Sequence, residues 1–96
     1  MGNVFQYYGK YNIIKKIGGY MLDLYILEHC PYCKKVMAFF DEKGIKYNKI
    51  DTEEKSAEET LIKLGGKRQV PFLVDRERNI QMYESSDIIE YAKTII

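Results

Sequence analysis

Short apolar runs alternate with amphipathic segments along most of the chain. Residues 22–27, LDLYIL, are almost continuously apolar, which is typical of a strand buried on both faces. Apolar side chains then recur at helical spacing over residues 33–43, and Gly44 follows as a natural helix end. The alternation in YNKI, residues 47–50, predicts a second strand.

A second helix is predicted after this strand. Ser56 is followed three residues later by Glu59, a spacing typical of a capping box at a helix start. Leu61 and its apolar neighbours continue the helical pattern, and the Gly65-Gly66 pair is expected to end the helix.

The last part of the chain predicts a hairpin and a third helix. PFLV at 71–74 and IQMY at 80–83 flank the polar turn DRERN. Ser85 or Ser86 is then expected to cap a helix that runs towards the C-terminus. The predicted order is βαβαββα, an α/β fold in which a parallel pair and an antiparallel hairpin form a mixed four-stranded sheet flanked by helices.

Composition limits the classes of function. The 96 residues, 46% of them hydrophobic, suit one small globular domain, and a net charge of +1 gives no field that favours nucleic acid. No run of about 18 apolar residues could span a bilayer. Lys10, Lys15 and Lys16 interrupt any secretory signal core. We therefore expect a cytoplasmic protein that binds neither nucleic acid nor membrane.

Residues 1–20 are expected to form an N-terminal extension to a domain at 21–96. Three residues of the extension fall at helical spacing: Val4, Tyr8 and Tyr11. The segment is interpreted as an extra packing helix, although a basic aromatic helix can also rest on anionic lipid. Because the recognisable pattern begins at Met21, that residue is an alternative start.

The stretch HCPYC, residues 29–33, lies between the first predicted strand and the first predicted helix. Pro31 suits the first helical position, which places Cys30 at the helix N-terminus, where free N–H groups and the helix dipole stabilise a thiolate. In a reducing cytosol such a pair is more often redox-active than a structural disulfide. We expect Cys30 to be the nucleophile and Cys33, one turn into the helix, to resolve the mixed disulfide.

A metal site is the alternative use of two close cysteines. Tetrahedral zinc needs four ligands, and the chain offers one cysteine pair and one histidine, His29, directly before Cys30. We therefore expect no metal. His29 is interpreted as a loop side chain that modulates the thiolate rather than as a ligand or a base.

Three motifs in order carry a family resemblance. CPYCKK, then QVPFLVD, then YESSDIIEYA resemble the landmarks of glutaredoxin over residues 21–96. The later two are also similar to the thioredoxin-like N-terminal domain of glutathione transferases. Both families bind glutathione, so either resemblance implies the same ligand and a thioredoxin-like fold.

The resemblance implies a cis Pro71 that faces the cysteine pair. It also implies that the main chain of Val70 pairs with the cysteinyl backbone of glutathione, and that the helix N-terminus at Ser86 and Asp87 holds the γ-glutamyl end. Without the resemblance, these two residues would be ordinary helix caps. The implied glutathione site consists of Tyr32, Arg68, Gln69, Val70, Pro71, Ser86 and Asp87.

Three features depart from the family pattern: the extension at residues 1–20 and two segments near this site. Leu27 stands where many glutaredoxins have a lysine for the glycyl carboxylate, and Arg68, with Gln69 beside it, is expected to supply the charge instead. Residues 82–84, Met-Tyr-Glu, replace the family's Gly-Gly before the Ser-Asp pair.

The sequence is interpreted as a monomeric thiol-disulfide oxidoreductase. It would reduce protein disulfides or protein–glutathione mixed disulfides, with glutathione as co-substrate and no tightly bound cofactor. One alternative is a dimer in which two chains, each supplying Cys30, hold a [2Fe–2S] cluster with two glutathiones. A second is a dithiol reductant that thioredoxin reductase recharges.

Overall fold

The computed structural model describes residues 19–96, and the predicted N-terminal helix lies outside them. The elements are β1 (Leu22–Ile26), α1 (Pro31–Lys43), β2 (Asn48–Asp51), α2 (Lys55–Gly65), β3 (Phe72–Asp75), β4 (Ile80–Met82) and α3 (Ser85–Thr94). The predicted order βαβαββα is confirmed, and each predicted strand lies within two residues of the observed one.

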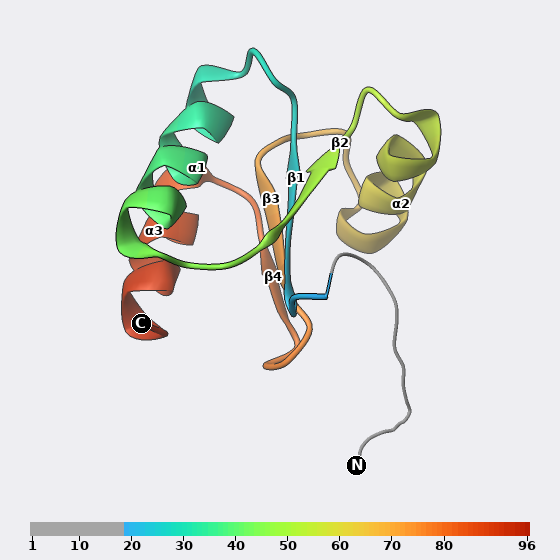
Figure 1. The fold of residues 1–96 in the computed structure, drawn as a ribbon. Coiled ribbons are helices and arrows are strands. Elements are labelled where there is room, and N and C mark those ends of the chain that lie inside the picture. The colour runs from blue at the N-terminus through green and yellow to red at the C-terminus, as the bar shows by residue number, and fades with distance from the viewer. Residues whose placement is uncertain (1–18) are drawn as a thin grey trace.

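The four strands form one mixed sheet in the order β2-β1-β3-β4. β1 pairs with β2 in parallel, whereas β3 is antiparallel to both β1 and β4. α1 and α3 cover one face of the sheet, and α2 covers the other (Figure 1). This is the α/β arrangement predicted from the sequence.

Both faces of β1 are buried, as its apolar run predicts. Leu24 and Ile26 belong to the core under α1 and α3, together with Phe40. On the opposite face, Tyr25 packs with Phe72 in a smaller cluster that includes a residue of α2. The alternation of side chains along a strand therefore divides one short segment between two cores.

The capping-box prediction for α2 is wrong. The helix begins at Lys55 with Glu54 as N-cap, and no side chain caps it. The N–H of Glu54 donates to the Asp51 carbonyl oxygen at 3.2 Å, so the chain turns directly out of β2. Ser56 is therefore already helical and cannot act as the N-cap.

The serine-cap prediction for α3 is also wrong. Ser85 is the first helical residue, so Ser86 lies within the first turn, and Glu84 occupies the N-cap position without a side-chain bond. The helix starts early because Glu84 adopts a φ of 70° and ψ of 116°, which reverses the chain immediately after β4.

The glycine pair that ends α2 has two different functions. Gly66 adopts the left-handed conformation, with φ of 91°, and stops the helix as predicted. Gly65 is instead required for close packing, because a Cβ atom there would lie 2.1 Å from the Tyr83 hydroxyl oxygen. That hydroxyl donates to the Lys67 carbonyl oxygen at 2.9 Å.

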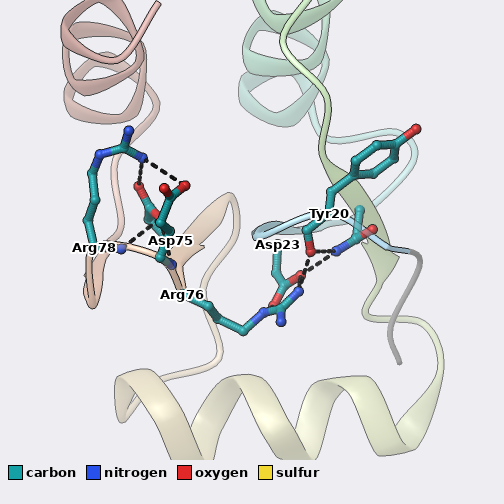
Figure 2. A network of polar contacts seen from close by, with 7 residues as sticks. Tyr20, Asp23, Asp75, Arg76 and Arg78 are labelled. Atoms are coloured by element: carbon teal, nitrogen blue, oxygen red, sulfur yellow. Dashed lines mark hydrogen bonds and ion pairs between the residues drawn. The ribbon is translucent and has the colours of Figure 1, made fainter. Parts of the chain in front are cut away.

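Two buried aspartates lie near the start of β1 and the end of β3 (Figure 2). Asp23 accepts from Arg76 Nε at 2.8 Å. Asp75 accepts from Arg78 at 3.1 Å and from the Tyr91 hydroxyl at 2.5 Å. The two ion pairs satisfy carboxylates that burial would otherwise penalise.

Candidate active site

Cys30 lies in the loop from β1 to α1 and caps that helix. Its backbone is extended, its N–H donates to the Leu27 carbonyl oxygen at 3.1 Å, and Pro31 occupies the first turn as predicted. The Sγ atom accepts from the Cys33 backbone N–H at 3.4 Å. A half-buried sulfur is therefore held at a helix N-terminus, where backbone donors are free to bind negative charge.

Cys33 lies one turn further along α1 and is fully buried. It packs in the core under α1 and α3, and both cysteines are free thiols in the structure. Burial raises the pKa of the Cys33 thiol to about 12, and the neighbouring Cys30 adds to this increase. The two thiols of one C-x-x-C motif therefore differ sharply in their access to solvent.

A cis peptide bond joins Val70 to Pro71, as the resemblance implied. This bond leads into β3 and lies on the wall of a pocket of about 520 Å³. The lining residues are Tyr32, Lys35, Gln69, Val70, Pro71, Glu84, Ser85 and Ser86. Five of the seven residues predicted to bind glutathione thus lie around one cavity.

Three lining residues were absent from the predicted site: Lys35, Glu84 and Ser85. Two predicted residues, Arg68 and Asp87, do not line this pocket, although Asp87 lies in the first turn of α3. The motif YESSDIIEYA did contain the signal for Glu84 and Ser85, because both directly precede the predicted Ser86.

Glu84 belongs to residues 82–84, which stand where the glutaredoxin resemblance implies Gly-Gly. A φ of 70° is unusual for a residue with a Cβ atom, and such strain costs about 1–3 kcal/mol and concentrates at functional sites. The Glu84 carboxylate accepts from Gln69 Nε2 at 3.3 Å. The sharp turn is thus kept without glycine, and a carboxylate is placed on the pocket wall.

His29 and Arg68 each lie close to a carboxylate. His29 Nε2 lies 3.6 Å from the Glu53 carboxylate and Arg68 Nε lies 3.0 Å from that of Glu58. The side chain of His29 is 79% exposed, so it is a loop side chain, as interpreted from the sequence.

Within residues 19–96, no helix is long and apolar enough to cross a membrane.

Comparison with known proteins finds a family model and several sequence relatives. Residues 24–95 match the family model of the glutathione S-transferase N-terminal domain. The chain is 38% identical over 77 residues to prostaglandin E synthase 2 of Mus musculus, covering 78% of this chain and 20% of that protein. It is 36% identical over 70 residues to glutaredoxin 2 of Escherichia coli strain K12, covering 73% of this chain and 32% of that protein.

A solved structure extends the likeness to the fold. Glutaredoxin 2 from Salmonella typhimurium, in complex with glutathione, matches with a TM-score of 0.67 and 28% identity over 79% of this chain and 34% of that chain. The chain thus spans a fifth to about a third of these relatives. The family model, the relatives and the fold agree, and the chain belongs to the thioredoxin-like family of glutaredoxins and glutathione S-transferase N-terminal domains.

Proposed function

We propose that this domain catalyses thiol-disulfide exchange, with glutathione as co-substrate. The observation that carries the proposal is the difference between the two thiols: Cys30 Sγ lies at the N-terminus of α1, whereas Cys33 is buried one turn away. A thiolate that is accessible and stabilised can attack a disulfide, and a neighbouring thiol can then displace the product.

In the first step, the Cys30 thiolate attacks one sulfur of a substrate disulfide. A bond forms between Cys30 and that sulfur, the substrate S–S bond breaks, and the other sulfur leaves as a thiolate. Cys33 then loses its proton and attacks Cys30, which forms the Cys30–Cys33 disulfide and releases the second substrate thiol. Two molecules of reduced glutathione restore the dithiol and are themselves oxidised to the disulfide.

The pocket beside the cis Val70–Pro71 bond is proposed to bind glutathione. The free main chain of Val70 would pair with the cysteinyl backbone, and the N-terminus of α3 at Ser86 and Asp87 would hold the γ-glutamyl end. The pocket's position at this helix N-terminus and the glutathione-bound relative support the proposal. We also propose that the exchange takes place in the cytoplasm, where a dithiol is kept reduced.

The proposal is tested by coupling the reaction to glutathione reductase, with a glutathione mixed disulfide and a protein disulfide as parallel substrates. Cys30→Ser is expected to abolish turnover of both substrates. Cys33→Ser should still reduce the mixed disulfide, because glutathione can resolve the intermediate, but should lose protein disulfide reduction.

Loss of mixed-disulfide turnover in Cys33→Ser alone would reverse the roles of the two cysteines. The same assay is repeated with thioredoxin reductase in place of glutathione and glutathione reductase, to compare the two electron donors. Efficient recharging by thioredoxin reductase, with no response to glutathione, would contradict glutathione as the co-substrate.

A further inference from the structure

Gln69 and Val70 line two cavities of different chemistry. One is the 520 Å³ pocket, which contains charged and hydroxyl side chains. The other is a cavity of about 100 Å³ lined by Leu27, Thr52, Glu58, Leu61, Arg68, Gln69 and Val70. Because the Leu27 carbonyl oxygen accepts from the Cys30 N–H, the smaller cavity lies beside the backbone of the nucleophile.

A substrate that pairs with the main chain of Val70 would place the two neighbours of its cysteine on opposite flanks of that residue. One neighbour would meet the larger pocket and the other the smaller cavity. In glutathione, the neighbour assigned to the smaller cavity is glycine with its free carboxylate. This step rests on the proposed function.

The smaller cavity is poorly suited to a carboxylate. Leu27, Leu61 and Val70 supply apolar walls, and Leu61 is fully buried. The cation on the wall is Arg68, whose guanidinium already bonds to Glu58 at 3.0 Å. An incoming carboxylate would meet the negative charge of Glu58 on the same guanidinium and would lose water against an apolar surface.

An aliphatic side chain suits the cavity better. The volume is smaller than the cavities of about 150 Å³ that take benzene, so a side chain of the size of valine is the appropriate occupant. Its burial is favourable and leaves the pair between Arg68 and Glu58 intact.

We propose that Glu58 is a specificity-determining residue that occupies Arg68 and so favours protein disulfides in which an apolar residue follows the reacting cysteine. Glu58 acts on the substrate through Arg68 and does not contact the reacting sulfur. The substrate class is therefore an internal cysteine followed by a residue with a small aliphatic side chain. It is preferred over a cysteine followed by a C-terminal glycine with its free carboxylate.

A single-turnover reaction with three mixed disulfides tests this preference. The peptides acetyl-Cys-Val-amide, acetyl-Cys-Gly-amide and acetyl-Cys-Gly with a free carboxylate are each joined to thionitrobenzoate. Cys30 attacks the peptide sulfur, the peptide–thionitrobenzoate bond breaks, and coloured thionitrobenzoate leaves with the electron pair. Each rate is divided by the rate of the same disulfide with free N-acetylcysteine, which removes differences in intrinsic reactivity.

The valine amide is expected to react about fivefold faster than the glycine amide with the wild-type domain. Glu58→Gln should raise the rate of the free-carboxylate peptide about threefold to fivefold relative to the rates of both amides. The matched control is Glu59→Gln, which removes the same charge from an exposed residue of α2 that forms no ion pair within the described chain, and it should change none of the rates.

Leu27→Lys adds a cation and fills the apolar cavity, so it should favour the free-carboxylate peptide over the valine amide. Equal wild-type rates for the two amides, or the same behaviour of Glu58→Gln and Glu59→Gln, would overturn the inference. Absence of Cys30-dependent release from every peptide would instead contradict the proposed function.

Discussion

At the scale of single residues, one helical turn gives the two cysteines different chemical properties. Cys30 precedes α1 and its sulfur faces the free N–H groups of the first turn, whereas Cys33 points into the core with Val36 and Phe40. Burial raises the pKa of Cys33 to about 12, so this residue is a thiol at neutral pH. It must lose its proton before it can attack the mixed disulfide at Cys30.

The resolving step is therefore expected to accelerate with pH. Because the pKa of Cys33 is raised to about 12, its thiolate fraction should keep growing about tenfold per pH unit beyond pH 8.5, where that of an ordinary thiol levels off. The domain is loaded with glutathione at Cys30, and glutathione release is followed after mixing into buffers of increasing pH. If the release rate instead reached a plateau near the ordinary thiol pKa of about 8.5, this prediction would be contradicted.

The control for this measurement is the Cys33→Ser variant, loaded in the same way. It lacks the resolving thiol, so glutathione should remain attached at every pH. Release from this variant at the wild-type rate would mean that water or an external thiol, rather than Cys33, is responsible.

At the scale of the elements, the junction between β4 and α3 concentrates strain beside the pocket. Glu84 holds a positive φ at the N-cap of α3, and its carboxylate bonds to Gln69, which precedes the cis Val70–Pro71 bond. Two pocket walls that are distant in sequence are thereby joined by one side chain. Strain at this position is compatible with a binding function, because a glycine would relieve it but would lack the carboxylate.

Replacing Glu84 by two different small residues separates these contributions. Glu84→Ala and Glu84→Gly both remove the carboxylate, but only glycine adopts the positive φ without steric cost. We expect the glycine variant to be more stable than the alanine variant by about 1–2 kcal/mol. Urea unfolding monitored by circular dichroism measures the difference, and equal stabilities would show that the backbone relaxes in the alanine variant.

At the scale of the whole molecule, the redox site and the polar network lie at opposite ends of β1. Cys30 follows the end of the strand, whereas Asp23 lies near its start (Figure 2). Leu22, the first residue of β1, pairs with Asp75 of β3. Burial alone would raise the pKa of Asp75, but hydrogen bonds from Tyr91 and Arg78 outweigh it and lower the pKa. Burial, and next to it the hydrogen bond to Asp75, raise the pKa of Tyr91 to about 12.

This network makes stability depend on pH at the acidic end. A carboxylate with a lowered pKa in the folded state stabilises the fold above its unfolded pKa of about 3.9, and this contribution is lost as the pH falls through the folded value. Tyr91→Phe removes a donor to buried Asp75. It should lower the free energy of unfolding by about 1–2 kcal/mol at pH 7, and by less at low pH.

Urea unfolding at several pH values measures this dependence. The matched control is Tyr32→Phe, which removes a hydroxyl from a side chain that is 64% exposed and should leave stability unchanged. If Tyr91→Phe lowered the free energy of unfolding equally at pH 7 and at low pH, its effect would not depend on the ionisation of Asp75, and the prediction would be wrong.

Features that depend on neighbouring residues follow from the amino-acid sequence alone. The apolar run of β1, Pro31 in the first turn of α1 and the glycine ends of α1 and α2 follow from local backbone preferences and periodicity, so they could be predicted. The order of these elements placed Cys30 before a helix, and the family motifs correctly implied the cis Pro71.

The way in which distant segments meet became visible only in the folded molecule. Glu84 takes a conformation that its residue type disfavours, because β4 must turn at once into α3 beside the pocket. Arg68 pairs with Glu58 of α2 beside an apolar cavity, a contact that the sequence did not predict. Ion pairs and cavities between elements depend on packing across long sequence separations, and neither residue spacing nor local propensity specifies it.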